Sequence, residues 1–493
     1  MPAPDAAVIE GRAGIVEELR RIVPGEGVIA SEAERRVYES DGLTAYRELP
    51  LVVVLPSTVD QVSAVLRFCK RMGVKVVPRG AGTSLSGGAL PLADGVLLGM
   101  AKFNRVLEVD YDNRCAVVQP GVTNLAISKA VESAGFYYAP DPSSQIACTI
   151  GGNVAENSGG VHCLKYGLTT NNILGIEMVL MGGEVIQLGG KHLDAENYDV
   201  LGVMTGSEGL LGVVTEVTVR ILPKPTAARA LLVGFPTTEN AADCVAAVIA
   251  DGIIPAGMEM MDRPAIHAAE AFVKAGYPLD VEALLIVELD GPPSEVDHLI
   301  GKVEGIARDH HATAIRTSRD EAERLAFWSG RKAAFPAVGR ISPDYYCMDG
   351  TIPRSRLAEV LSRMRGLSAQ YRLGVANVFH AGDGNLHPLI LYDANDRDQV
   401  ERAEAFGADV LRLCVEVGGV LTGEHGVGVE KRDLMGTMFD EFDLAHQQRL
   451  KCAFDPGGLL NPGKVFPQLH RCAELGRLHV RGGRLPFPDL PRF

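Results

Sequence analysis

Length, composition and charge exclude several classes of protein. The chain has 493 residues and a formal net charge of −14 at pH 7, and a chain longer than about 300 residues usually forms more than one domain. The acidic balance argues against nucleic acid as a partner, because phosphate binding needs clustered Lys and Arg. No apolar run approaches a membrane span, and residues 1–23 lack the basic start and apolar core of a signal peptide. We therefore expect a cytoplasmic protein without an integral membrane segment.

The first 225 residues alternate between strand and helix patterns. The apolar run 51–56, stopped by proline, predicts a buried strand, and residues 58–69 predict a helix with one apolar face. Further elements follow in the same style, which indicates a mixed α/β arrangement. Strands are expected at 97–100, 106–109, 116–120, 173–181, 184–188 and 213–222, and a helix at 124–135.

Beyond the Pro223-Lys224-Pro225 boundary the pattern changes. Strands and helices between residues 231 and 316 predict a smaller α+β unit of ferredoxin-like arrangement without glycine-rich loops. Long helices are expected at 398–418 and 439–454, and the tail from residue 471 has the composition of an extension.

Three glycine-rich runs, at residues 78–88, 140–160 and 205–215, indicate ligand binding. Bare backbone N–H groups of the first run, with nearby hydroxyls and Arg79, suit a diphosphate. Leu85 replaces the third glycine of a dinucleotide fingerprint, and no ATP-type phosphate loop occurs. The first run alone fits a surface turn about equally well, but three such runs predict one long ligand across a domain.

The sharpest signal lies in residues 380–387. With Asp383-Gly384 as a two-residue hairpin turn, His380 is expected directly opposite His387, at a Cβ separation of about 5 Å. Glu424, between two glycines, offers a third ligand, and two His with one carboxylate leave open metal positions for substrate oxygens. The alternative is a pair of hydrogen-bonded hairpin histidines and a surface acid.

His425 follows Glu424 directly and suits a general base beside such a metal, although a lone histidine is usually structural. The nine cysteines show no C-x-x-C spacing, which argues against zinc ribbons and iron–sulfur ligation within this chain.

These motifs, together with residues 341–353 and 455–464, resemble the FAD-linked 2-hydroxy-acid dehydrogenases of the vanillyl-alcohol-oxidase superfamily. The resemblance covers residues 51–466. It is strongest toward the large flavin subunits of bacterial glycolate oxidases, and D-lactate and D-2-hydroxyglutarate dehydrogenases are near relatives.

The resemblance implies an α+β fold, with a two-subdomain FAD-binding domain of vanillyl-alcohol-oxidase type and an inserted ferredoxin-like cap domain. The predicted parts are an N-terminal helical segment (1–50), the FAD-binding domain (51–225), the cap (226–420), a C-terminal helical part that returns to the flavin (421–467) and the extension (468–493).

The resemblance also assigns residues to the cofactor. Thr83 stands where relatives with covalent flavin carry a histidine, so FAD is expected to bind noncovalently. The FAD-contacting residues implied are Pro78, Arg79, Gly80, Ala81, Gly82, Thr83, Ser84, Pro142, Cys148, Thr149, Gly152, Asn153, Gly159, Glu208, Gly209, Gly212, Val214 and Asn461.

For the substrate, the resemblance implies that Arg331 fixes a carboxylate. Zinc, manganese or iron held by His380, His387 and Glu424 would bind the 2-oxygens, with His425 as catalytic base. Relatives that oxidise diacids tend to have a basic residue at the position of Cys347, so a small monoacid is expected.

The implied activity is oxidation of a small 2-hydroxy acid to the 2-oxo acid, with hydride transfer to FAD. Electrons would pass to a second flavin-type subunit and an iron–sulfur subunit or a quinone-linked acceptor, which could place the protein at the inner face of a membrane. The alternatives are a D-lactate dehydrogenase that acts alone and, in another class, a flavin-binding structural subunit.

Overall fold

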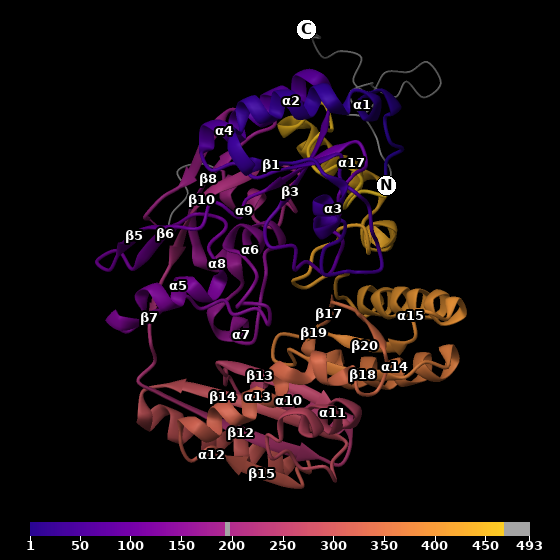
Figure 1. Ribbon diagram of the computed structural model, residues 1–493. Helices are drawn as coiled ribbons and strands as arrows, with labels where there is room; N and C mark the ends of the chain where they lie inside the picture. Colours follow the sequence, from indigo (N-terminus) through magenta and orange to yellow (C-terminus); the bar gives the residue numbers. More distant parts are fainter. Residues whose placement is uncertain (193–197, 468–493) are drawn as a thin grey trace, which may run out of the picture.

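Two small sheets build the first part of the chain in the computed structural model, which describes residues 1–192 and 198–467 (Figure 1). The first sheet has the order β1-β2-β4-β3, in which β2, β4 and β3 run parallel. Helices α2 and α4 cover one face of it, since their apolar residues share a core with β2, β3 and β4. The bounds are α1 Ala6–Glu10, α2 Arg12–Ile22, β1 Val28–Ile29, α3 Glu32–Arg35, β2 Val52–Val54, α4 Val59–Met72, β3 Lys75–Arg79 and β4 Gly95–Gly99.

Helix α4 shows how the local sequence sets these bounds. Thr58 caps its start by accepting a hydrogen bond from the backbone N–H of Gln61, and Gly73 ends it in the left-handed region at φ 68°. The buried face of α4 carries the apolar residues that the sequence predicts, Val62, Val65, Leu66 and Cys69.

The second sheet is antiparallel, with the order β5-β6-β10-β8-β9. Its core includes apolar residues of α5 and α6, so these helices lie against the sheet. The bounds here are β5 Val106–Asp110, β6 Cys115–Val118, α5 Asn124–Val131, β7 Phe136–Tyr137, α6 Ile150–Glu156, α7 Cys163–Tyr166, α8 Thr169–Asn172, β8 Ile173–Val179, β9 Val185–Gly189, α9 Val200–Met204, β10 Val213–Arg220 and β11 Leu222–Pro223.

The cap is built on one seven-stranded sheet with the order β15-β12-β14-β13-β18-β20-β16, whose pairs are all antiparallel. Helices α10, α12, α14 and α15 share one core with the sheet, and α11 and α13 share another. The bounds are β12 Ala227–Phe235, α10 Thr238–Ala250, β13 Gly257–Asp262, α11 Arg263–Val273, β14 Ala283–Gly291, α12 Pro293–Asp309, β15 Ala314–Thr317, α13 Glu321–Val338, β16 Asp344–Cys347, β17 Gly350–Thr351, α14 Leu357–Tyr371, β18 Val375–Phe379, β19 Asn385–Leu386, β20 Pro388–Tyr392 and α15 Arg397–Glu416.

After the cap the chain returns to the first part, where its yellow segment lies in Figure 1. Helices α16 Met435–Met438 and α17 Glu441–Phe454 precede a bridge between Leu460 and Val76 of β3. The backbone N–H of Asn461 donates to the carbonyl of Val76 at 2.7 Å, so the end of the described chain is joined to the strand before the first glycine-rich run. The predicted extension, 468–493, lies outside the described residues.

The expected register of the histidine hairpin is wrong. His380 pairs with Asn385 rather than with His387, and four residues, 381–384, form the loop instead of two. The reason lies in the flanking strands: β18 pairs with β20 so that Asn377 lies opposite Pro388, and His387 accepts at its carbonyl from the backbone N–H of Val378 instead of lying opposite His380.

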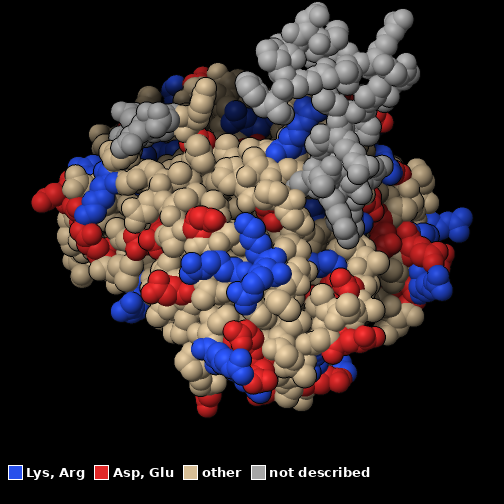
Figure 2. Space-filling view, turned by 90° about the horizontal axis from the view of Figure 1, so that it is seen from above, with Lys and Arg blue, Asp and Glu red and all other residues tan. Residues whose placement is uncertain are grey.

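The outer surface carries mixed charge. Figure 2, which looks down on the side of α1 and α2, shows acidic and basic side chains interspersed around one central basic group. In residues 1–192 and 198–467, no helix is both long and apolar enough for a membrane span.

Candidate functional site

The three glycine-rich runs converge on one cavity of about 420 Å³. The cap closes it with side chains from α13 and β16 and with three residues of the histidine and Glu424 segments. Its cap-side lining residues are Lys332, Phe335, Pro336, Tyr345, His387, Glu424 and His425.

The glycine side of the cavity has the form of an anion cradle. A Cβ on Gly80 would lie 2.5 Å from the Thr149 hydroxyl, and Gly82 has φ 75°, which side chains disfavour. The buried Thr149 hydroxyl has no hydrogen-bond partner in the described part of the chain. Glycine backbone without side chains and the unpartnered Thr149 hydroxyl fit a ligand whose oxygen atoms lie against this side of the cavity.

His380, His387 and Glu424 meet at one point. The Nε2 atoms of the two histidines lie 3.4 and 3.1 Å from Oε1 of Glu424, and the two ring centroids are 5.0 Å apart. The predicted ligands therefore converge even though their strand register differs from the expected one. Three ligand atoms within 4.8 Å of one another suit a divalent cation after small side-chain shifts.

The opposite nitrogen of each histidine is already committed. Nδ1 of His380 donates to Glu259 at 2.7 Å, and Nδ1 of His387 donates to the carbonyl of Met348 at 3.3 Å. These contacts leave both Nε2 atoms aimed at Glu424, as metal-ligating histidines require. Burial alone would lower the pKa of His380, but Glu259 and Glu424 raise it well above its usual range.

Asp349 holds the segment that carries Glu424 and His425. Its carboxylate lies at 0% exposure beside the Lys431 ammonium, 3.0 Å away. Although burial opposes ionisation, Lys431 keeps the pKa of Asp349 well below its usual range. The carboxylate also accepts hydrogen bonds from the Thr422 hydroxyl at 2.6 Å and from the backbone N–H groups of Gly423, Glu424 and His425 at 3.0, 3.2 and 2.9 Å.

His425 lies on the other side of His387. The two rings stack with centroids 5.0 Å apart and planes 10° apart, and Nε2 of His425 is 4.0 Å from Oε1 of Glu424. Burial lowers the pKa of His425 to about 4. The ring is therefore neutral near pH 7, and its Nε2, which faces the metal ligands, can accept a proton.

The sequence matches two families. The family described as "FAD binding domain" covers residues 50–189, and "FAD linked oxidases, C-terminal domain" covers residues 224–465. The glycolate oxidase subunit GlcD of Escherichia coli (strain K12) is 58% identical, over 98% of this chain and 97% of its own length. The chain belongs to the FAD-linked oxidases.

Of two further comparisons, the first concerns a sequence relative and the second supports the fold alone. A D-lactate dehydrogenase of Archaeoglobus fulgidus is 33% identical over 92% of this chain and 99% of its own. The solved structure of 4-ethylphenol oxidase from Gulosibacter chungangensis superimposes with a TM-score of 0.79 at 17% identity, over 95% of this chain and 99% of that chain. The predicted FAD-linked family and vanillyl-alcohol-oxidase type of fold are confirmed.

FAD is the ligand expected in a member of this family, and the cavity formed by the three glycine-rich runs fits it. Most of the residues predicted to contact FAD line this cavity. The lining ones are Pro78, Arg79, Gly80, Ala81, Gly82, Thr83, Ser84, Pro142, Cys148, Thr149, Gly152, Asn153, Glu208, Gly209, Gly212 and Val214. Gly159 and Asn461 are not among them. Gly159 lies against Glu424, and the Asn461 amide donates to the carbonyls of Gly88 and Glu208, joining two of the runs.

Arg331 does not line the cavity. It is 1% exposed and donates from Nε to Glu259 at 2.7 Å, while its Nη2 has no partner within residues 1–192 and 198–467. The neighbouring Lys332 lines the cavity instead. Sequence reasoning missed Lys332, Glu259 and Asp349, because an isolated charged residue in a helix or an apolar strand carries no local signal of its partner.

We expect His380→Ala and His387→Ala to lose a bound divalent cation and to retain FAD, because neither residue belongs to the glycine-rich runs. Metal analysis by mass spectrometry, expressed per bound FAD, measures both. His267→Ala, which changes an exposed histidine whose ring is hydrogen-bonded to the carbonyl of Leu279, is the matched control. Unchanged metal occupancy in both variants would reject these ligands.

We expect Asp349→Asn to weaken metal retention and to slow flavin reduction with FAD still bound. The substitution keeps the shape but removes the closest ion-pair partner of the buried Lys431, which is left with Glu430 at 3.9 Å. Breaking a buried ion pair costs up to about 3–5 kcal/mol. Asp349→Asn combined with Lys431→Met should recover part of the thermal stability but not the metal, whereas the exposed Asp398→Asn should behave like the parent. Normal metal content in Asp349→Asn would show that residues 423–425 keep their conformation without the negative charge of Asp349.

Proposed function

We propose that this chain is the catalytic flavin subunit of a glycolate-oxidising enzyme, which converts a small 2-hydroxy acid to the 2-oxo acid. One observation carries the proposal: His387, Glu424 and the neutral His425 line the same cavity as the FAD runs. A proton acceptor, a candidate metal site and the cofactor cradle therefore face one small space. The 58% identity to a glycolate oxidase subunit favours glycolate among the possible acids.

Oxidation of a 2-hydroxy acid removes the hydroxyl proton and a hydride from C2. Bound FAD supplies the hydride acceptor, and a divalent cation on His380, His387 and Glu424 supplies a Lewis acid for the 2-oxygen. His425 takes the hydroxyl proton at Nε2, since that nitrogen faces Glu424 at 4.0 Å. Met348 and Glu259 keep the two ligand histidines oriented throughout.

Arg331 is the proposed partner of the substrate carboxylate. Its guanidinium is fully buried, and the unpartnered Nη2 is a donor that a carboxylate would satisfy. Lys332, the next residue of α13, does line the cavity and attracts an anionic substrate toward it.

The cap side favours a short acid. Phe335 and Tyr345 meet edge to face with centroids 6.1 Å apart, and Phe335 meets the His387 ring at 6.4 Å. Cys347, 8% exposed and close to the rings of His387 and His425, offers no charge to a second carboxylate. A distal carboxylate would therefore be buried without a partner.

The electrons that substrate oxidation transfers to FAD must pass to an acceptor. Without C-x-x-C spacing in its sequence, we propose that a second flavin-type subunit and an iron–sulfur subunit or quinone-linked acceptor receive them, which would hold the protein in the cytoplasm at the membrane surface. The alternative, a stand-alone D-lactate dehydrogenase, has weaker support at 33% identity. A purely structural subunit would not need the converging His380, His387 and Glu424.

The decisive test mixes the purified protein anaerobically with glycolate, D-lactate or 2-hydroxyglutarate and follows bleaching of the flavin spectrum. We expect rapid bleaching by glycolate, slower bleaching by D-lactate and far slower bleaching by the diacid, because its second charge lacks a partner. Equal kcat/KM for 2-hydroxyglutarate and glycolate would refute the size argument. No bleaching by any of the three acids would favour the structural subunit.

Glu424→Gln and His425→Asn should separate metal binding from proton transfer. Glu424→Gln removes the only anionic ligand, so metal retention should fall. His425→Asn should keep metal and FAD but slow single-turnover flavin reduction by about 10²–10⁴-fold, the usual loss on removing a general base. His446→Asn, on exposed α17, is the matched control. Unimpaired flavin reduction in His425→Asn would mean that another group takes the proton.

A further inference from the structure

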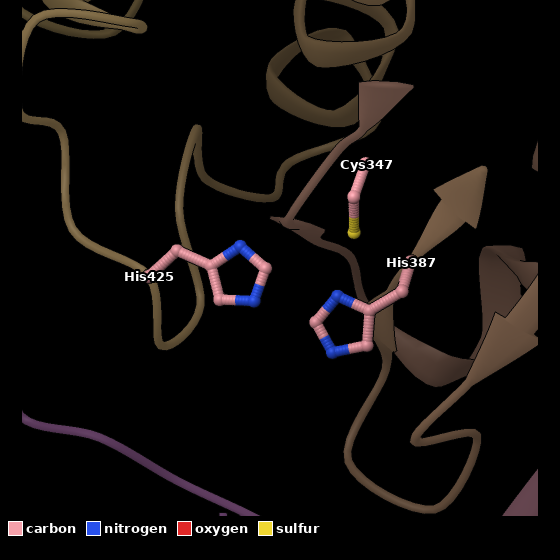
Figure 3. Close-up of side chains that lie close together, drawn as sticks. All are labelled: Cys347, His387 and His425. Carbon is pink, nitrogen blue, oxygen red and sulfur yellow. The ribbon is translucent and has the colours of Figure 1, made fainter. Parts of the chain in front are cut away.

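A second group of potential metal ligands shares His387 with the first. Figure 3 shows the sulfur of Cys347 pointing toward the ring of His387, with the His425 ring on another side. One ligand atom from each of these three residues lies within 4.8 Å of the other two. Only His387 belongs to both groups, since the first is completed by His380 and Glu424.

The three residues come from segments that the fold holds firmly. Cys347 ends β16, which pairs with β20 directly after His387, so sulfur and imidazole are carried by adjacent strands. His425 is fixed by its backbone bond to Asp349 and by the stacked contact with His387. The side chains therefore start close to ligating positions.

The donors of this group are chemically different from those of the first. A thiolate with two imidazoles suits soft or borderline cations such as Cd²⁺ and Zn²⁺, whereas Mg²⁺, Ca²⁺ and Mn²⁺ prefer oxygen. The sulfur has one weak contact, to the carbonyl of Met348 at 3.4 Å, and Nδ1 of His425 has no partner among the described residues. His387 is the ligand that has to give up a contact, either that of Nδ1 with the Met348 carbonyl or that of Nε2 with Glu424.

We propose that Cys347, His387 and His425 form a binding site for soft divalent cations, distinct from the His380, His387 and Glu424 group, and that its occupation inhibits the enzyme. Binding forms one metal–sulfur and two metal–nitrogen bonds and releases the thiol proton to solvent. The inhibition rests on the proposed function, because a ligated His425 cannot take the substrate proton. The binding itself does not depend on that function.

Cadmium is the probe, because a thiolate–cadmium bond gives a charge-transfer band in the ultraviolet. The FAD-loaded protein is titrated with CdCl₂, and difference spectra are compared with equilibrium dialysis. We expect the band in the parent protein, in His380→Ala and in Cys244→Ala, which removes another buried thiol. We expect none in Cys347→Ala, and at least about 10-fold weaker cadmium binding in His425→Asn. Thermal melting and FAD content establish that each variant is folded.

Three results would overturn the site: no band in the parent, a band that persists in Cys347→Ala, or its loss in His380→Ala, which would place cadmium in the first group. Inhibition is measured separately, as the fall in the rate of anaerobic flavin reduction by glycolate when Cd²⁺ is added at a fixed Mn²⁺ concentration. We expect Cys347→Ala to need at least about 10-fold more Cd²⁺ for the same slowing than Cys244→Ala does. A normal band without slowing would keep the site and reject His425 as the base.

Discussion

The carboxylate of Asp349 is the interaction on which the site depends most. It lies at the end of the cap sheet, yet it binds the backbone N–H groups of residues 423–425, which follow the cap in sequence. Each of these donors, if buried without a partner, would cost about 1–3 kcal/mol. The backbone N–H groups of Glu424 and His425 both donate to Asp349, so one carboxylate sets the positions of both residues. Lys431 keeps that anion charged in a fully buried setting.

A second chain of charges fixes the histidines from the other side. Arg331, Glu259, His380 and Glu424 follow one another through contacts of 2.7, 2.7 and 3.4 Å. Removal of one member would leave a buried charge without its partner, which is strongly destabilising. The substrate cation that we propose and the metal ligand are therefore coupled through Glu259. The site belongs to neither half of the molecule alone, because the cap supplies His380 and His387, the segment after it supplies Glu424 and His425, and the first part supplies the glycine-rich runs.

Much of this was accessible from sequence where the signal is local. The glycine-rich runs, the histidine pair and Glu424 between two glycines each indicate their chemistry within a few residues. The structure brings the runs, His387 and Glu424 to one cavity, and His380 lies beside them. The hairpin register was not accessible, because it continues the pairing of β18 with β20, in which Asn377 lies opposite Pro388, and does not follow from a two-residue turn at Asp383-Gly384. Glu259 and Asp349 were missed because each is a single acid in an apolar strand or near the end of one. Their side-chain partners lie 36 to 121 residues away in sequence.

His387 links these constraints, because it belongs to both groups of potential metal ligands and stacks on His425, the proposed base. A base that acts beside a Lewis acid must lie close to a metal ligand, so His425 stacks on His387 at 5.0 Å. The residue behind the pair must be small and uncharged if a short monoacid is to be favoured, because a cation there would pair with a second carboxylate. Cysteine meets that need but adds a sulfur beside two imidazoles. In the arrangement that we propose, the choice between the two groups depends on the preference of hard cations for the oxygen of Glu424 over the sulfur of Cys347.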